Sequence, residues 1–597
     1  TAKDLSNASV TSLDEALQKL TPSFSSMTNG MGTTLSLNGL PDDYFIFLEN
    51  GKRLYGDDTY ARINVAKIKR IEILNGASSA LYGTNAIGGV INIITDDAKN
   101  AINVSSDTRY ASKGRFTQSV NIDVNTGKFG SYTSYRRQQA EGWQLNPYEE
   151  NSKTHELEET GKVASTGFYA NTVNQKFTFD ATDKLSFYAR GGYYDNKTRR
   201  PYEAYDYNIL HETFNYGIGA QYMINKGNYI TADCYADHFS SSYCFFKDNK
   251  TYNGKAGEEQ VRKRTRNHNL SIKGIFKLGN RHKLSVGTEY IVDVLKSQTD
   301  NIAKEDAYTL ALFAQDEIKL LRNLQALIGV RYIYHENFKN HATPNVALMY
   351  KPGKFNFRAS YAAGFRTPTL SELYATDIAK KNDRLTIGNL DLKPEKNNYF
   401  SLSAEYVHER FSVSVNAFYN NIRDMIDYNT IATGDKAMEQ YGHKEVRQRD
   451  NIAEAKVYGI NVSANAYLGA GFNLSGGYTH LNTQDVELEQ PIDKSIKNAY
   501  NINAQWAHSW KIYRLNINLN GRINSKRFSK SYGYAPEYQL WDLNTRHSFN
   551  LKSVIIEPGC GMENLFDYMD DRPYNSNYAT LTPGRSFYIS LSLKFKS

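Results

Sequence analysis

The sequence predicts an all-β transmembrane barrel of about 22 antiparallel strands, with an N-terminal α/β plug domain in the lumen. Three observations lead to this prediction: a long series of alternating apolar and polar residues, a high content of aromatic residues, and a different pattern in the N-terminal region. We expect the plug domain at 1–100 and the transmembrane β-barrel at 101–597.

The N-terminal region mixes helix and strand patterns. Leu13, Leu17 and Leu20 repeat at the spacing of one helix face, and Thr11 or Ser12 can cap the start of that helix. Residues 44–48 are apolar and predict a buried strand, while residues 68–74 alternate and predict another that stops at Asn75-Gly76. These features are typical of a small α/β module.

From residue 101 onward, strands of about ten residues or more alternate apolar and polar side chains. Clear examples are 400–406, 411–419 and 587–595. A strand with its connection takes about 22 residues here, which gives about 22 strands, and barrels of that size have a plugged lumen. A β-sandwich also alternates, but its strands are usually shorter and it divides into domains.

Composition agrees with a barrel of this kind. The chain contains 45 tyrosines, and its aromatic content of 13% is high enough for girdles at both membrane interfaces. Mean hydropathy is −0.59, and no run of about 18 apolar residues predicts a transmembrane helix. A large secreted β-protein is the alternative on composition alone. The net charge of +8 is small for this length and predicts no nucleic-acid partner.

The basic stretch 261–266 and the cysteines leave alternatives open. The basic stretch is typical of a solvated strand end, or else of a contact with anionic lipopolysaccharide. Cys234, Cys244 and Cys560 are an odd number, so they cannot all pair within the chain. Cys234 and Cys244 either bridge one loop or remain free thiols.

No enzyme is predicted. The sequence has no nucleophile elbow, no paired-histidine zinc motif and no phosphate-binding loop. A catalytic group assembled at the barrel rim is an alternative that spacing does not exclude, but a plug would have no purpose in such an enzyme. A passive porin is a third alternative, and the plug argues against it as well.

Residues 68–95 read IKRIEILNGASSALYGTNAIGGVINIIT. This segment resembles the plug signature of TonB-dependent outer-membrane receptors. Barrel segments agree with the resemblance: 364–368 (GFRTP) with 372–374, 388–395 (GNLDLKPE, without the family's first proline), and 563–567 (ENLFD) with 583–585. Gly83, Gly88 and Gly89 permit positive φ angles and close backbone approach.

The resemblance covers the whole chain and implies a transporter in the Gram-negative outer membrane that imports a scarce, bulky nutrient. It also implies the TonB energy-coupling complex as a partner, engaged by strand addition through an extended segment. Thr1 to Val10 show no such segment, so we expect it upstream of Thr1. A surface lipoprotein that captures substrate is a further partner to consider.

Cobalamin, haem and ferric siderophores are the candidate nutrients. Haem receptors that resemble this chain commonly bind the haem iron through a His between the two barrel motifs, and often through one in the plug. Residues 369–387, between the motifs, contain no His, and the first His of the chain is His155, so the plug has none. Ferric siderophores are mostly anionic and favour Arg or Lys with aromatic residues. Cobalamin is nearly neutral and favours Tyr, Asn and Ser. The expected outer loops are rich in tyrosine and mixed in charge, so we predict cobalamin first, with haem or haemoglobin and ferric siderophores as alternatives.

The pocket is expected where plug and barrel meet. In the plug loop 51–58, Arg53, Tyr55 and Asp57 offer hydrogen bonds and one flat apolar face. The barrel residues predicted to complete the site are Tyr202, Tyr205, Tyr207, Tyr532 and Tyr534. The alternative for these barrel tyrosines is a girdle facing lipid headgroups.

No cofactor is required, but calcium is a candidate ligand of the outer loops. Asp195, Asp206 and Asp248 could supply carboxylate oxygens to such an ion. The alternative is that they are solvated loop residues.

Overall fold

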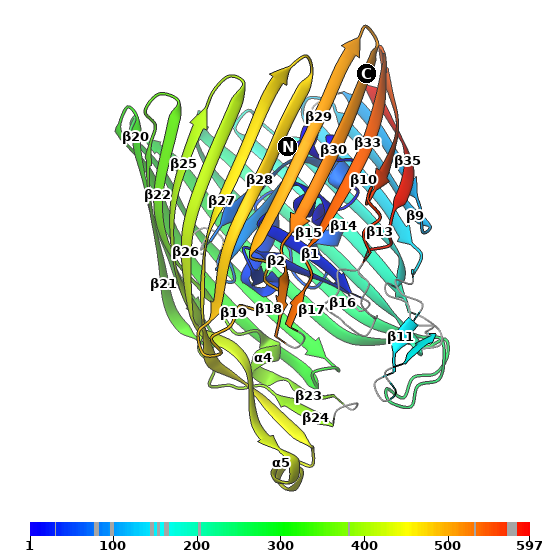
Figure 1. The fold of residues 1–597 in the computed structure, drawn as a ribbon. Coiled ribbons are helices and arrows are strands. Elements are labelled where there is room, and N and C mark those ends of the chain that lie inside the picture. The colour runs from blue at the N-terminus through cyan, green and yellow to red at the C-terminus, as the bar shows by residue number, and fades with distance from the viewer. Residues whose placement is uncertain are drawn as a thin grey trace.

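Twenty-two long antiparallel strands close into one barrel, and the N-terminal residues fold inside it (Figure 1). This computed structural model describes residues 1–597 except 30–31, 77–82, 96–100, 144–147, 152–153, 155, 160–165, 201–204, 380–382, 531–532, 570–581 and 597. The strand number and the position of the plug confirm the predicted architecture. Among the described residues, no helix is both long and apolar enough to span a bilayer.

The barrel strands, in chain order, are β8 (Ile102–Ala111), β9 (Arg115–Asn125), β10 (Phe129–Ala140), β13 (Gly167–Asp180), β14 (Leu185–Arg199), β15 (Tyr207–Asn225), β16 (Asn228–Phe245), β17 (Glu259–Leu278), β18 (His282–Ser297), β19 (Ile302–Leu321), β20 (Leu324–His335), β21 (Lys339–Tyr350), β22 (Phe355–Arg366), β25 (Glu395–Val407), β26 (Phe411–Thr433), β27 (Glu445–Gly469), β28 (Phe472–Asp485), β29 (Asn498–Trp510), β30 (Tyr513–Asn524), β33 (Tyr538–Leu551), β34 (Val554–Glu563) and β35 (Ser586–Lys596). The last strand pairs with the first, from Tyr588 opposite Ala111 to Lys596 opposite Asn103.

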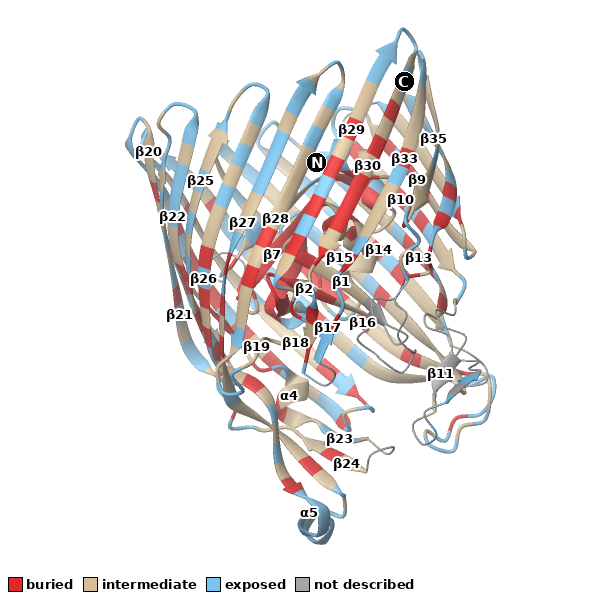
Figure 2. Ribbon diagram, in the orientation of Figure 1, coloured by how far each residue is buried: buried red, intermediate tan, exposed pale blue. Residues whose placement is uncertain are grey.

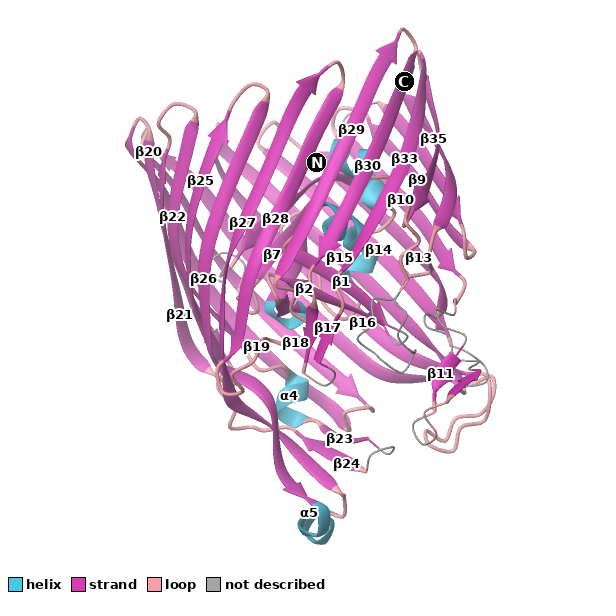
Figure 3. Ribbon diagram, viewed as in Figure 1, coloured by secondary structure: helices cyan, strands magenta, loops and turns pink. Residues whose placement is uncertain are grey.

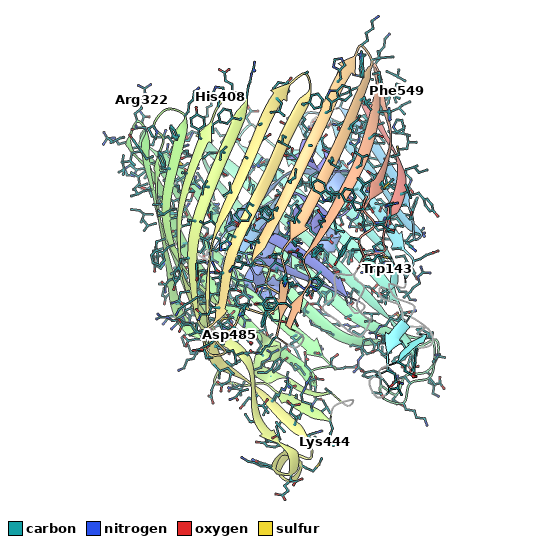
Figure 4. The ribbon with its side chains drawn as sticks, viewed as in Figure 1. Trp143, Arg322, His408, Lys444, Asp485 and Phe549 are labelled. Carbon is teal, nitrogen blue, oxygen red and sulfur yellow. The ribbon has the colours of Figure 1, made fainter. Side chains whose placement is uncertain are left out.

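The two ends of the barrel differ in the length of their connections. Turns such as 226–227, 322–323 and 470–471 are short, whereas connections such as 367–394 and 434–444 are long. Because outer-membrane barrels place short turns in the periplasm and long loops outside, the long connections define the outer end. Figure 4 labels Arg322 and His408 at the periplasmic end and Lys444 towards the outer end.

An arm extends from the outer end of the barrel. β27 has 25 residues, about 80 Å of strand, although about 9–11 residues suffice to cross a membrane. The short strands β23 (Thr376–Ala379) and β24 (Arg384–Ile387) add to its side, and α5 (Gly434–Tyr441) caps its tip (Figure 3). Leu385, Ala437 and Val446 form part of a small apolar core in this arm.

Side-chain alternation along the strands separates a lipid-facing side from a lumen-facing side. On β25, Phe400 and Leu402 are 50% and 65% exposed, whereas Asn397 and Tyr399, of the opposite parity, are buried. Buried residues concentrate where the barrel wall meets the plug (Figure 2). The predicted alternation in 400–406, 411–419 and 587–595 is therefore confirmed.

The plug contains two small sheets and short helices. Its elements are α1 (Ala2–Asn7), α2 (Leu13–Leu20), β1 (Phe24–Asn29), β2 (Gly32–Leu37), β3 (Leu40–Pro41), η1 (Asp42–Tyr44), β4 (Phe45–Glu49), β5 (Lys52–Arg53), η2 (Thr59–Arg62), η3 (Val65–Lys67), β6 (Ile68–Asn75) and β7 (Gly89–Thr95). Strands β5, β4, β7 and β6 form one sheet in that order. Ser12 caps α2 by accepting from the Glu15 amide, as predicted. The predicted strand 44–48 begins one residue later, because Tyr44 closes a 3₁₀ turn.

The plug glycines serve close packing. Gly89 has φ 149°, and a Cβ atom there would lie 2.6 Å from the Leu74 carbonyl oxygen. Gly83 has φ 86°, a left-handed conformation that favours glycine.

A disulfide between Cys234 and Cys244 is ruled out. Both residues lie on β16, ten positions apart and therefore about 33 Å from each other. All three cysteines of the chain are free. Of the two alternatives that the sequence left open, free thiols hold, because the chain between the two residues continues as one strand and not as a loop.

Candidate functional site at the plug loop and outer mouth

The plug loop between β5 and η2 lies against strands β15 to β17. Arg53 donates to the Thr84 carbonyl oxygen at 3.0 Å, and its guanidinium carbon lies 4.9 Å from the centre of the Tyr55 ring. Burial raises the pKa of Tyr55 well above its ordinary value, so its hydroxyl remains a neutral donor. Arg53 and Tyr55 therefore form one preformed cation–π unit.

Asp237 on β16 clamps this loop to the barrel. Its carboxylate accepts from the Tyr55 amide at 3.0 Å and from Arg62 Nη1 at 3.2 and 3.0 Å. Arg62 Nη2 donates to the Tyr55 and Asp57 carbonyl oxygens at 2.5 and 3.1 Å. The side chains of Arg62 and Asp237 are 5% and 0% exposed. Removing one partner of this buried ion pair would therefore cost several kcal/mol, because the other charge would stay buried without a counter-ion.

Two acidic residues tether the tip of the loop. Asp57 is 3.3 Å from Lys263 Nζ, and Asp58 is 2.6 Å from His211 Nδ1. Burial raises the pKa of Asp58, but the hydrogen bond and charge of His211 outweigh it, so the net pKa is lowered. One lysine and one histidine of the barrel wall thus hold the acidic tip of the plug loop.

A set of tyrosines and arginines, the outer aromatic cluster, stands above this wall. Tyr207 stacks on Tyr243 with ring centres 4.0 Å apart, and Tyr252 contacts both rings edge-on. Arg262 lies 5.3 and 4.8 Å from the ring centres of Tyr243 and Tyr252. Tyr207 shares a strand face with His211, which contacts the plug, so the cluster faces the lumen.

The predicted Tyr205 and Tyr207 belong to this cluster, with Arg200 at 3.8 and 5.1 Å from their ring centres. Tyr534 does not join them: it lies in β32 (Gly533–Ala535), is 58% exposed and packs on Phe528. Tyr202 and Tyr532 lie outside the described residues. Whether Arg53, Tyr55, Asp57 and these tyrosines bind substrate stays a prediction.

Sequence reasoning missed Arg262, Tyr243 and Tyr252. Arg262 belongs to the basic stretch 261–266, where a β-bulge beside Ser242 changes which face each residue presents. The extra residue of the bulge is Arg262 itself. Lys263 has the parity of the buried Asn267 and reaches the plug, while Arg264 and Arg266 share parity with the lipid-exposed Leu270. Contact of these two arginines with lipopolysaccharide stays a prediction. Bulges of this kind leave no clear mark in the sequence.

The candidate calcium ligands do not converge. Asp206 accepts from Asn249 Nδ2 at 2.8 Å and Asp248 from the Ala256 amide at 2.9 Å. Asp195 instead accepts from Asn171 Nδ2 on the neighbouring strand β13. In the part of the chain that the structure describes, no group of three His, Cys, Asp or Glu is arranged to hold a metal. Calcium binding therefore stays a prediction.

The two barrel motifs noted in the sequence meet at the plug. Arg366, from the first motif, contacts Glu395, from the second, at 2.5 Å and Glu372 at 3.0 Å. Glu395 is fully buried and also accepts from the Tyr44 hydroxyl at 3.2 Å and from the Ile426 amide at 2.8 Å. Burial and the Glu395 charge raise the pKa of Tyr44 well above its ordinary value. The motifs thus form a polar contact between barrel and plug, made by Tyr44, Glu395 and Arg366, which we call the latch.

Comparisons with known proteins agree with this architecture. Residues 1–90 match the TonB-dependent Receptor Plug Domain model, and residues 114–559 match the TonB dependent receptor-like, beta-barrel model. A ferric enterobactin receptor (PfeA) mutant from Pseudomonas aeruginosa is similar in structure, with 17% identity, TM-score 0.85, and coverage of 100% of this chain and 98% of that one.

Two further solved structures are similar. The siderophore receptor PirA from Acinetobacter baumannii has 16% identity, TM-score 0.81, and coverage of 100% and 98%. The FrpB iron transporter from Neisseria meningitidis has 14% identity, TM-score 0.77, and coverage of 99% and 98%. At these identities the likeness establishes the fold alone.

Proposed function

The chain belongs to the TonB-dependent receptors, transporters of the Gram-negative outer membrane, and on that premise we propose that it imports an anionic ferric siderophore. The cargo would bind above the plug loop and cross the barrel when the TonB complex acts on the plug. The proposal replaces the cobalamin prediction from the sequence, which the similar structures do not favour, since those named for a ligand or cargo are receptors for ferric enterobactin and siderophores, or an iron transporter.

The observation that carries the proposal is the outer aromatic cluster. Arg200 and Arg262 each lie over two tyrosine rings, at 3.8–5.3 Å from the ring centres. An anionic chelate with aromatic arms matches this surface, because guanidinium groups pair with its charge while the rings stack on its arms. A nearly neutral ligand would gain little from these arginines.

A bound chelate can contact the plug as well as the barrel. The tethers of Asp58 and Asp57 connect the plug loop to β15 and β17, and the Arg53–Tyr55 unit belongs to the same part of the plug. An anion near Arg53 would also compete with Asp57 for Lys263, since opposite charges attract at close range. Loosening this tether is a physical means by which cargo binding could reach the plug.

Titration calorimetry on the purified receptor tests the proposal. Ferric enterobactin is expected to bind, whereas cyanocobalamin and haemin are not. Changing Arg200 and Arg262 to Ala should weaken ferric enterobactin binding at least about tenfold, in the range for residues that dominate an interface. Arg322→Ala, at the periplasmic end, is the matched control. Binding of cyanocobalamin without binding of the ferric chelate would refute the proposal.

A further inference from the structure

A cavity of about 1100 Å³ lies between the plug and the periplasmic half of the barrel wall. Plug residues Ile73 to Asn75, at the end of β6, form one side. The opposite side consists of residues of β17 to β22, β25 and β26, and it reaches the periplasmic turn 279–281. Pockets that enclose drug-sized ligands have volumes of about 300–1,000 Å³, so this space can accommodate a bulky chelate.

The cavity is polar and carries excess positive charge. Its lining includes five Lys and Arg residues but two Glu residues: Lys277, Arg281, Lys283, Lys319 and Arg358 against Glu317 and Glu405. One Glu is already paired, because Lys283 Nζ lies 2.8 Å from Glu317, while Glu405 accepts from Asn356 Nδ2 at 3.2 Å. Clefts lined by one sign of charge concentrate counter-ions, so this cavity favours anions.

An apolar seal closes the cavity towards the outside. Tyr399 of β25 is 5% exposed and packs with Leu40, Tyr44 and Ile87 of the plug in one apolar cluster. Gly76, the residue after β6, lies so close that a Cβ atom there would be 2.3 Å from the Tyr399 ring. Above the seal stands the latch of Tyr44, Glu395 and Arg366.

The wall above the cavity is also less tightly paired than its neighbours. β21 pairs with β22 over six residues, Asn345 to Tyr350, whereas it pairs with β20 over twelve. The carbonyl oxygen of Phe365, in the part of β22 that β21 does not reach, accepts from the Asn85 amide of the plug at 3.2 Å. Latch, seal and cavity therefore lie in series along one side of the barrel.

We infer that this cavity is the periplasmic half of the translocation path, and that its cations conduct the anionic cargo after it passes the Tyr399 seal. The inference rests on the proposed function and deepens it. Because the space already exists, opening the path requires the plug to separate from β22, β25 and β26 along one side. The rest of the plug can remain in the barrel.

The first test reverses charge in the cavity and measures binding and uptake separately. The variant combines Lys277→Glu, Arg281→Glu and Arg358→Glu. We expect an unchanged Kd for ferric enterobactin at the cell surface and an uptake rate reduced at least about tenfold, the order by which charged clefts alter ion entry. The control combines Lys128→Glu, Arg514→Glu and Lys552→Glu, which lie towards the periplasmic end but outside the cavity.

The second test keeps the inference falsifiable if the charge variant fails to fold. Ser403→Cys, in a background with Cys234, Cys244 and Cys560 changed to Ser, places a thiol in the cavity wall. Labelling with fluorescein maleimide should block uptake but not binding. Labelling Asn550→Cys, near the periplasmic end of β33 and outside the cavity, should affect neither.

Uptake within about twofold of wild type in the folded charge variant, or after complete labelling of Ser403→Cys, would overturn the inference while leaving the proposed function intact. Absence of ferric enterobactin binding to the unmodified receptor would overturn the proposed function, and the inference with it.

Discussion

The Asp237→Asn substitution measures how strongly the barrel holds the plug loop. Asparagine has almost the same shape and can still accept from the Tyr55 amide, which Asp237 binds at 3.0 Å. It leaves Arg62, whose side chain is 5% exposed, as a buried cation without its counter-ion. Breaking a buried pair in this way costs about 3–5 kcal/mol, and we take the lower end because one hydrogen bond survives.

A loss of about 3 kcal/mol corresponds to about a 150-fold change in an equilibrium constant, since each 1.4 kcal/mol is a factor of ten. Hydrogen exchange followed by mass spectrometry on peptides covering 50–62 is the assay, because it reports local opening rather than unfolding of the barrel. Exchange of the Tyr55 amide should accelerate by about this factor, and peptides from β27 should not change.

Arg62→Met in the Asp237→Asn background removes the orphaned charge and should restore part of the protection. A double-mutant cycle should therefore give a coupling of at least about 1.5 kcal/mol between the two positions. Acceleration below about threefold in Asp237→Asn would refute the idea that this pair holds the loop, and no restoration in the double variant would show that charge burial is not the cause.

Other predictions address the plug and the cysteines. The double variant Arg53→Ala, Tyr55→Ala should weaken ferric enterobactin binding by about 1–3 kcal/mol, measured by calorimetry. The heat-modifiable migration of the barrel on a gel should not change. An affinity equal to that of the wild type would place the binding site wholly in the barrel loops. Asp42 is exposed to solvent, but desolvation by the surrounding protein and the charge of Asp43 raise its pKa to about 6. Its stabilising contribution is therefore complete below about pH 4 and is lost as the pH rises through about 6. Asp42→Asn should therefore remove this pH dependence from hydrogen exchange of residues 42–45, and an unaltered profile would contradict the assignment. Arg522 donates to the carbonyl oxygens of Gln18, Thr21, Pro22 and Phe24. Arg522→Met should therefore destabilise the C-terminal end of α2 by about 3 kcal/mol, measured by hydrogen exchange, and Arg522→Lys should destabilise it less. Equal effects of the two substitutions would show that the guanidinium is not needed. Thiol titration of the denatured, unreduced chain should find three free thiols. A result of one free thiol per chain would show that two of the cysteines form a disulfide.

The barrel was predictable because the bilayer imposes a two-residue period. Phe400 and Leu402 face lipid, while Asn397 and Tyr399 face the lumen. The sequence shows this contrast as an alternation of apolar and polar residues. The plug helix was equally clear from the spacing of Leu13 and Leu17, both of which are buried. Local periodicity thus determines the element types and the approximate strand number.

The site was less predictable because it depends on contacts between distant segments. Asp237 and Tyr55 are far apart in sequence, and no local pattern distinguishes Asp237 from other lumen-facing acids. The plug loop 51–58 was selected because the pocket is expected where plug and barrel meet, and Tyr207 because it lies in a tyrosine-rich segment expected in an outer loop. Substrate binding by these residues stays a prediction. Tyr243 was missed because it lies within β16, and its contact with Tyr207 arises from strand register.

The junction of β35 with β8 has a consequence for biogenesis. The strand that seals the cylinder is the last of the barrel to leave the ribosome, and it pairs with the first strand after the plug. Until β35 is in place, β8 and β34 each present a row of unpaired amides and carbonyls, which hydrocarbon does not tolerate. Removing 586–597 should therefore produce a chain that cannot mature in the membrane and is cleared by periplasmic proteases, even though the plug, the latch and the outer aromatic cluster would all be present in it.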